Sequence, residues 1–140
     1  MFKLQYPILS AIVDNPYKHV HHADVVRILE AGREAFLAYI GFPLEALLQQ
    51  QLLLVVTRVD VRYLREVLSG TVTVTCEDPE LSKKEVIVKQ RIINQKGKTA
   101  VEASIHSAFV SAALKRAVPP PDAFLDASCR CLLGGIDIVR

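Results

Sequence analysis

A segment near the N-terminus repeats apolar residues at intervals of three and four positions. This spacing predicts one long amphipathic helix over Ala23–Ile40. Asp24 favours the start of the helix through the helix dipole, and Gly41 marks its end. Pro43 opens a second, short helical stretch that reaches Gln50. The apolar positions that carry the period are Val25, Ile28, Leu29, Gly32, Phe36, Tyr39 and Ile40.

Beyond Leu52 the pattern changes to the β-branched residues and alternating polarity of strands. The turn residues Gln95–Lys98 separate two of these strands and predict a hairpin. Strands that follow one another through short turns are expected to pair antiparallel. Together with the helix, this order predicts an α+β fold in which an antiparallel sheet covers the long helix. The predicted strands are one before Asp14, and then Val55–Tyr63, Gly70–Glu77, Glu85–Asn94 and Thr99–Ser111.

The composition supports a single compact domain, because 51% of the 140 residues are hydrophobic. We predict this domain to span residues 1–120, with residues 121–140 as a tail that either docks or stays mobile. The net charge of +2 argues against nucleic acid as a partner. No apolar stretch is long enough to cross a membrane and no export signal is recognised, so we expect a cytoplasmic protein without membrane insertion. The odd number of cysteines, without paired spacing, fits free thiols.

Arg33 is out of place on the predicted helix. At about 100° per residue it falls inside the apolar arc, between Ile40 and Val26. A guanidinium on a buried stripe costs several kcal/mol unless it is paired or faces a wet cavity. Two explanations stay open at this point. Arg33 either pairs with Glu30 or reaches water, or it is a cation that faces a ligand.

Polar and titratable residues are concentrated just before the helix, over Asp14–His22. The free N–H groups and the dipole at a helix N-terminus favour a developing negative charge at such a place. His19, His21 and His22 lie close together, but their spacing matches no recognised metal motif. We therefore predict an anion-stabilising site here and no metal site.

Several of these segments together resemble a known family. The run His19-Val20-His21-His22-Ala23, followed by Glu30-x-x-Arg33, resembles the loop and helix signature D-x-x-G-H-V-[NY]-[NH] and E-x-x-R of the 4-hydroxybenzoyl-CoA thioesterase group. Val59–Leu64 is similar to a strand motif of that group, and Ile93–Ala103 is similar to its hairpin. The resemblance covers about residues 2–120.

The resemblance implies a hotdog fold, in which the sheet wraps around the central helix. It implies that two chains pair their sheets edge to edge, as a homodimer or within a homotetramer. It also implies hydrolysis of an acyl-CoA or acyl-carrier-protein thioester at the dimer interface, with release of a carboxylic acid and a thiol. Coenzyme A or phosphopantetheine would enter as part of the substrate, so no separate cofactor is expected.

The sequence departs from the family signature at two positions. The acidic catalytic position falls on Asn15, and Lys18 replaces the glycine before the histidine. An amide cannot act as a general base or as a carboxylate nucleophile. Either Asp14 takes that role, or the chain is an Asn variant similar to the thioesterases of enediyne polyketide pathways. The latter rely on Asn together with a helix Arg, which matches Arg33.

In the Asn variant, Asn15 would orient the thioester or a water molecule and Arg33 would stabilise the oxyanion. Glu30 would orient Arg33, and the N–H groups around Val20 and His21 would polarise the carbonyl. Some basic residues are candidates to contact the phosphates of coenzyme A, or else form a solvated face: Arg58, Arg62, Arg65, Lys83 and Lys84. The candidate catalytic residues are thus Asn15, Arg33, His19, Glu30 and Asp14, and the candidate substrate-binding residues are Val20, His21, Tyr17 and Arg62.

Two other functions remain open from the sequence. One is a non-catalytic protein that binds acyl thioesters in the same pocket. The other is an enoyl-CoA hydratase or dehydratase, because Asp14-Asn15-Pro16 with His19 resembles the D-x-N-P-x-H loop of those enzymes. The spacing differs, since Asp14 and Asn15 are adjacent.

Overall fold

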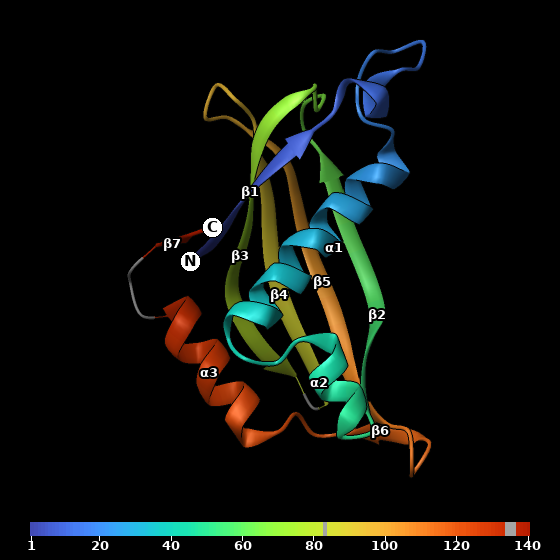
Figure 1. The fold of residues 1–140 in the computed structure, drawn as a ribbon, viewed down its shortest axis with the longest axis vertical. Coiled ribbons are helices and arrows are strands. Elements are labelled where there is room, and N and C mark those ends of the chain that lie inside the picture. Colours follow the sequence, from blue (N-terminus) through green and yellow to red (C-terminus); the bar gives the residue numbers. More distant parts are fainter. Residues whose placement is uncertain (83, 134–136) are drawn as a thin grey trace.

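A curved sheet wrapped against one long helix dominates the computed structural model (Figure 1). The structure describes residues 1–82, 84–133 and 137–140. Two segments of the chain pack on the same layer as the long helix, one after it and one at the C-terminus. The elements are β1 (Phe2–Ile8), η1 (Ser10–Val13), α1 (His22–Tyr39), α2 (Leu44–Gln49), β2 (Leu52–Tyr63), β3 (Gly70–Ser82), β4 (Glu85–Ile93), β5 (Thr99–Ser111), β6 (Arg116–Val118), α3 (Asp122–Leu133) and β7 (Ile138–Val139).

The strands of the sheet lie in the order β2-β5-β4-β3-β1-β7, with β6 paired to β5. The five longest strands pair antiparallel, and so do β5 and β6, which confirms the predicted sheet. Two details differ from the prediction. First, β2 and β3 follow one another in sequence but do not pair, because β5 and β4 lie between them. Second, the short strand β7 pairs parallel with β1.

Helix α1 begins and ends close to the predicted positions. His21 caps its N-terminus, since the backbone N–H of Ala23 donates to His21 Nδ1 over 3.1 Å. Gly41 follows its C-terminus with a φ of 87°, a conformation that favours glycine. The face towards the sheet is apolar and packs on β1, β3 and β4. At Gly32 the helix lies closest to the sheet, because a Cβ there would be 2.6 Å from Val74 Cγ1.

The C-terminal tail is docked, and its helix is an element that the sequence did not predict. Phe124 of α3 packs edge-on against Phe109 of β5, with ring centroids 4.9 Å apart, and against Phe42. Further along α3, Cys131 and Leu132 are buried in a cluster with Phe2 and other apolar residues. Residues 134–136 of the predicted tail lie outside the described residues. The tail therefore completes the core at the C-terminal end of α1.

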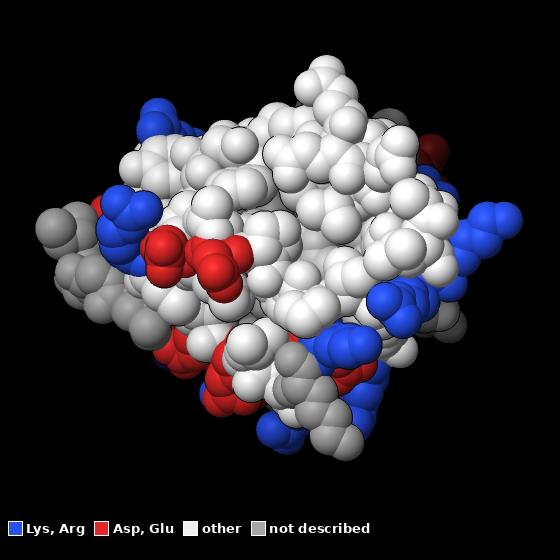
Figure 2. All heavy atoms as spheres, turned by 90° about the horizontal axis from the view of Figure 1, so that it is seen from below, with Lys and Arg blue, Asp and Glu red and all other residues white. Residues whose placement is uncertain are grey.

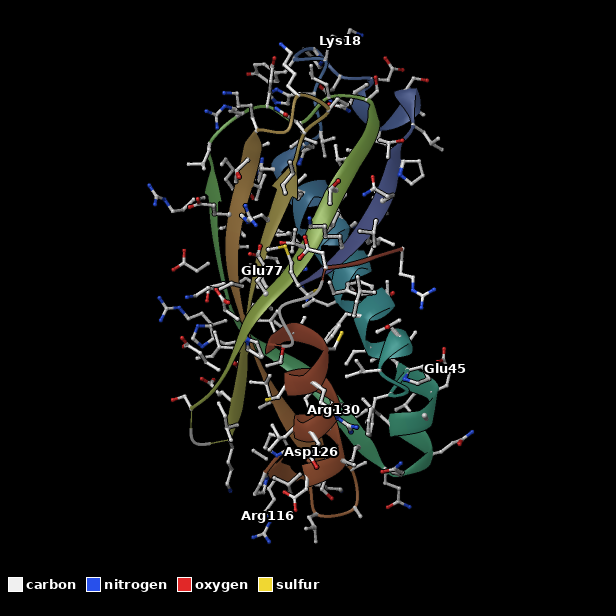
Figure 3. The ribbon with its side chains drawn as sticks, turned by 90° about the vertical axis from the view of Figure 1, so that its left-hand side faces the viewer. Lys18, Glu45, Glu77, Arg116, Asp126 and Arg130 are labelled. Atoms are coloured by element: carbon white, nitrogen blue, oxygen red, sulfur yellow. The ribbon has the colours of Figure 1, made fainter. Side chains whose placement is uncertain are left out.

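The two ends of the molecule differ in character. Lys18 lies at one end, in the loop between β1 and α1, and Arg116, Asp126 and Arg130 lie towards the other (Figure 3). The end that carries α2 presents a broad surface without charge, with Lys and Arg mainly at its margins (Figure 2). Neither α1 nor any other described helix combines the length and apolarity needed to cross a membrane.

Candidate functional site

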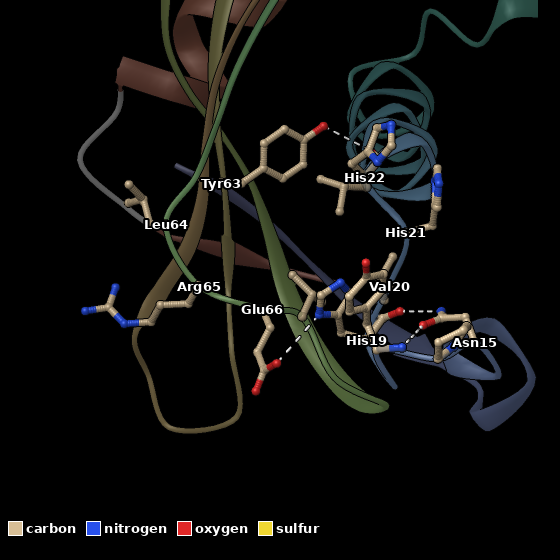
Figure 4. Close-up of a pocket in the computed structure, with 13 residues that line it drawn as sticks. Asn15, His19, Val20, His21, His22, Tyr63, Leu64, Arg65 and Glu66 are labelled. Atoms are coloured by element: carbon tan, nitrogen blue, oxygen red, sulfur yellow. Dashed lines mark hydrogen bonds and ion pairs between the residues drawn. The ribbon is translucent and has the colours of Figure 1, made fainter.

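A cavity of about 720 Å³ opens at the N-terminus of α1. The loop between η1 and α1 forms one wall, and the segment that follows β2 forms the other (Figure 4). The sequence predicted an anion-stabilising site at this helix end, and the cavity lies there. The residues that line it are Asn15, Pro16, Tyr17, His19, Val20, His21, His22, Val25, Tyr63, Leu64, Arg65, Glu66 and Val67.

Asn15 holds the shape of the loop. Its Nδ2 donates to the carbonyl oxygen of His19 over 2.7 Å, and its Oδ1 accepts from the backbone N–H of Tyr17 over 3.0 Å. A carboxylate at this position has no proton to donate to the His19 carbonyl. The departure from the acidic residue of the family signature thus has a structural reason: the loop uses the amide as both donor and acceptor.

Lys18 adopts the backbone conformation that explains the glycine of the family signature. Its φ is 57°, in the left-handed region that is costly for a residue with a Cβ atom. The loop backbone therefore resembles the glycine form although the side chain has changed. The Nζ atom of Lys18 lies 3.5 Å from Asp14, and both side chains are largely exposed.

The backbone amides at the start of α1 divide into bonded and free groups. The N–H of Val20 donates to the carbonyl oxygen of Val67 over 2.8 Å, so the prediction that this group polarises a substrate carbonyl is wrong. The next two amides, of His21 and His22, have no hydrogen-bond partner among the described residues. They are the available donors at the positive end of the helix dipole. The hydroxyl of Tyr63 donates to the carbonyl oxygen of His22 over 2.9 Å and ties β2 to this end of α1.

His19 lies in the cavity beside a carboxylate that the sequence analysis missed. Its Nδ1 is 3.6 Å from Glu66 Oε2, a charge contact slightly longer than a hydrogen bond (Figure 4). Its ring stacks on Tyr17, with centroids 5.5 Å apart. This arrangement directs Nδ1 to Glu66 and leaves Nε2 for another partner. Glu66 gave no sequence signal, because it belongs to the irregular segment after β2, and only the fold brings that segment to α1.

Two predicted residues do not belong to this cavity. Asp14 lies outside its lining and pairs with Lys18, so the prediction that Asp14 replaces the catalytic acid is not supported. Arg62 is directed to the outer face of the sheet, where it lies 3.9 Å from Glu102 and lines a separate charged groove. Arg65 is instead the basic residue of the cavity rim, with its Nη1 donating to the carbonyl oxygen of Thr99. Lys83 lies outside the described residues.

A second, apolar groove of about 300 Å³ runs between α1 and the sheet. Its walls come from one side of α1, from β2, β4 and β5, and from single residues of α2 and α3. Among its few polar lining residues are Glu30, Arg33 and Glu34. The rest of its lining is apolar apart from Ser107: Val26, Phe36, Leu37, Leu44, Leu54, Val56, Val59, Val86, Val88, Ile105 and Phe124. We call this feature the α1–β2 groove.

The structure identifies a partner of Arg33 that neither sequence explanation named. Its Nη1 donates to Gln90 Oε1 over 2.9 Å, and Gln90 is almost completely buried. Arg33 forms no salt bridge with Glu30 or with any other carboxylate that the structure describes. Burial lowers the pKa of Arg33, with weaker opposing contributions from nearby Cys76 and Glu30. The guanidinium is thus partly removed from water and has a neutral amide as its hydrogen-bond partner.

Asn15 and Arg33 line different cavities within one chain. Arg33 follows His22 by eleven residues along α1, which corresponds to about 16 Å of helix rise. The predicted joint action of Asn15 and Arg33 on one thioester is therefore not supported by the single chain. Of the predicted residues, the structure brings together Asn15, Tyr17, His19, Val20 and His21, and it places Glu30 and Arg33 in the α1–β2 groove.

The histidines of the loop do not form a metal site in the part of the chain that the structure describes. The rings of His21 and His22 lie 4.0 Å apart, but no group of three His, Cys, Asp or Glu side chains is placed to hold a metal ion. His21 Nδ1 is already used to cap α1.

Comparison with known families identifies the group of proteins. The family model of the thioesterase-like superfamily matches residues 12–128, which include both cavities' helix and most of the sheet. The chain belongs to the thioesterase-like superfamily. The sequence resemblance to hotdog-fold thioesterases is thereby confirmed, whereas the similarity to the Asn variant stays a prediction. None of the curated proteins matches the sequence significantly.

Solved structures of this superfamily share the fold. The DHNA-CoA thioesterase of Staphylococcus aureus superposes with a TM-score of 0.80 at 19% identity, covering 99% of each chain. The 1,4-dihydroxy-2-naphthoyl-CoA thioesterase of Synechocystis gives 0.82 at 13% identity, covering 91% of this chain and 95% of that one. A protein of Staphylococcus aureus in complex with CoA gives 0.83 at 18% identity, covering 92% and 82%. The predicted hotdog fold is confirmed.

Proposed function

We propose that this protein hydrolyses acyl-CoA thioesters at the cavity on the N-terminus of α1. One observation carries the proposal: His19, paired with Glu66, shares this cavity with the free amides of His21 and His22. A base and an oxyanion site side by side are what acyl transfer to water requires. Membership of the thioesterase-like superfamily and the likeness to CoA thioesterases support the same chemistry.

His19 acts as the general base in this proposal. Glu66 faces Nδ1 and stabilises the proton there, so Nε2 takes a proton from a water molecule as its oxygen attacks the thioester carbonyl carbon. The tetrahedral intermediate collapses with cleavage of the carbon–sulfur bond. The proton returns from His19 to the leaving thiolate, and the products are a carboxylic acid and coenzyme A.

The N-terminus of α1 stabilises the negative oxygen of the intermediate. The N–H groups of His21 and His22 are not used elsewhere in the described chain, and the helix dipole adds a favourable potential. Asn15 positions this site by fixing the carbonyl of His19. Arg65, at the outer rim of the cavity, is placed to meet a phosphate of coenzyme A (Figure 4).

The direct experiment measures thiol release from a panel of acyl-CoAs by purified wild type, His19→Ala and Glu66→Gln. We expect wild-type hydrolysis, with kcat lower by about a hundredfold in His19→Ala and by less in Glu66→Gln. Glu80→Gln is the matched control, because Glu80 is an exposed carboxylate on β3 outside both cavities. Equal rates in wild type and His19→Ala would contradict the mechanism.

Two other substrate or function classes are outcomes of the same assay. Binding of acyl-CoA without thiol release would mean a non-catalytic acyl-thioester-binding protein. Release from acyl-carrier protein but not from acyl-CoA would move the substrate to the carrier protein.

We further propose that two copies pair through β2. This strand lies at the edge of the sheet, and Leu53, Val55, Val56 and Val59 on it are between 38 and 44% exposed. An exposed apolar edge strand is a liability unless it is paired. Light scattering should give a homodimer, or a homotetramer built from it, for wild type and a smaller species for Val55→Asp. The control is Val139→Asp, on an exposed position of β7 at the opposite edge, and a monomeric wild type would overturn this proposal.

A further inference from the structure

The α1–β2 groove contains a cation for which the proposed hydrolysis has no use. Arg33 lies about 16 Å of helix rise from the amides at the start of α1, so it does not reach the proposed oxyanion. Its neighbours across the groove include the apolar residues Val56, Val59 and Ile105. A guanidinium has five N–H donors, and one hydrogen bond of Arg33 is found among the described residues, that to Gln90. A ligand in the groove therefore meets unsatisfied donors.

Gln90 fixes the direction of the guanidinium. Its Nε2 donates to the carbonyl oxygen of Leu29 over 2.9 Å and contacts Cys76 Sγ at 3.6 Å, so its Oε1 must face Arg33. Rotating this amide would bring its NH₂ group against the cation. Gly32 makes the reach possible, because a Cβ there would lie 3.2 Å from Gln90 Nε2. A buried amide with both ends engaged is a rigid support for a charged side chain.

The chemistry of the groove selects against a plain hydrocarbon chain. An unsubstituted acyl chain would cover the donors of Arg33 and take them from water without a replacement acceptor. An oxygen atom on the chain restores a charge-assisted hydrogen bond. Glu30 and Glu34 line the same groove and repel a carboxylate, which favours a neutral hydroxyl or keto oxygen over a second acid group.

We infer that the α1–β2 groove binds an acyl chain that carries a hydroxyl or keto oxygen, with Arg33 as the specificity-determining residue and Gln90 as its positioning residue. The inference rests on the proposed function for the place of the thioester. It adds the class of acyl group. A site built to hydrogen-bond a substrate oxygen discriminates strongly against the analogue that lacks it.

The test compares dodecanoyl-CoA with a set of hydroxydodecanoyl-CoAs and oxododecanoyl-CoAs that differ in the position of the oxygen. We expect wild type to prefer at least one oxygenated chain in kcat/KM by about tenfold to a hundredfold. Arg33→Met should remove this preference and improve the plain chain. Arg27→Met is the matched control, because Arg27 is an exposed residue of the same helix outside the groove.

The Gln90 variants separate positioning from simple packing. Gln90→Leu keeps the charge of Arg33 but removes its support, so KM should rise for the preferred oxygenated chain, while KM for dodecanoyl-CoA and kcat stay nearly constant. Gln90→Glu keeps an acceptor for Arg33 and should retain the preference. A rise in KM for both chains in Gln90→Leu would show a merely structural role and overturn the assignment of Gln90.

Binding of thioether analogues, which cannot be hydrolysed, keeps the inference separate from the proposed function. A preference of wild type for oxygenated thioethers, lost in Arg33→Met, supports the inference even if no thioester is hydrolysed. Hydrolysis with equal kcat/KM for plain and oxygenated chains, and equal binding of their thioethers, overturns the inference and leaves the proposed function intact.

Discussion

The N-terminal end of α1 and its middle are built in different ways. At the N-terminal end, Asn15 and His21 hold the backbone through hydrogen bonds to residues two and four positions away. In the middle, Arg33 depends on Gln90, which is 57 positions away on β4, and the contact requires the close approach of the helix at Gly32. The first region therefore responds to changes in the loop itself, and the second to changes in packing between helix and sheet.

Asn15→Asp tests the local design of the first region and is expected to have the largest effect on stability. The aspartate keeps the acceptor for Tyr17 but loses the donor to the carbonyl of His19. We expect a loss of about 1–3 kcal/mol in the free energy of unfolding, together with a lower kcat. Urea unfolding and thiol release measure the two effects. A gain of activity in Asn15→Asp would instead mean that the family's acidic mechanism can be restored, and would contradict the role of the amide given above.

Gly32→Ala tests the packing of the second region. Alanine normally stabilises a helix interior relative to glycine, but here the new Cβ would lie 2.6 Å from Val74 Cγ1. We expect a net destabilisation of about 1–2 kcal/mol. The substitution should cost less in a Val74→Ala background, where the clash is relieved. Stabilisation of the wild-type background by Gly32→Ala would contradict the close approach.

Lys18→Gly should sharpen the comparison in the opposite direction. Relief of the left-handed backbone at Lys18 is expected to raise the free energy of unfolding by up to about 1 kcal/mol. Lys115→Gly is a matched control, because Lys115 has a φ of 54° in the turn before β6, far from the cavity. Both variants should unfold at higher urea concentration with kcat unchanged. Destabilisation in Lys18→Gly alone would show that the Lys18 side chain contributes more than its backbone costs.

Cys76 reports on the dry surroundings of Gln90, with the smallest expected effect. Burial raises the pKa of its thiol from 9.0 to about 12. Because the folded-state pKa lies above the unfolded one, this group's stabilisation is complete below about pH 9 and is lost as the pH rises towards 12. Between pH 8 and pH 10 the free energy of unfolding should fall more steeply in wild type than in Cys76→Ala. Cys129→Ala, which changes an exposed thiol, should keep the wild-type slope.

Most of the fold was accessible from the sequence because its signals are local. The period of α1, the stop at Gly41 and the alternation in β3 and β5 each lie within one segment. The separation of β2 from β3 was not accessible, since the pairing of β2 with β5 depends on long-range contacts. Helix α3 was missed because its role depends on the aromatic cluster around Phe109, which only the fold assembles.

The site divides in the same way. The loop residues and the N-terminus of α1 were predicted, because a helix start and its preceding loop are contiguous in sequence. The anomaly of Arg33 was also visible, but its partner Gln90 and the carboxylate of Glu66 come from distant segments. Arg62 was misplaced because a strand alternates its side chains between two faces, and its neighbours Val61 and Tyr63 take the inner one.

Chemical rescue of His19→Ala tests the central claim most directly. If His19 is the general base beside the free amides of α1, added imidazole should enter the space left by the ring and restore thiol release. The account predicts a rate that rises with imidazole concentration by about tenfold or more in His19→Ala and stays flat in wild type. A variant that keeps its fold and binds acyl-CoA, but gains no activity with imidazole, would contradict the assignment of His19.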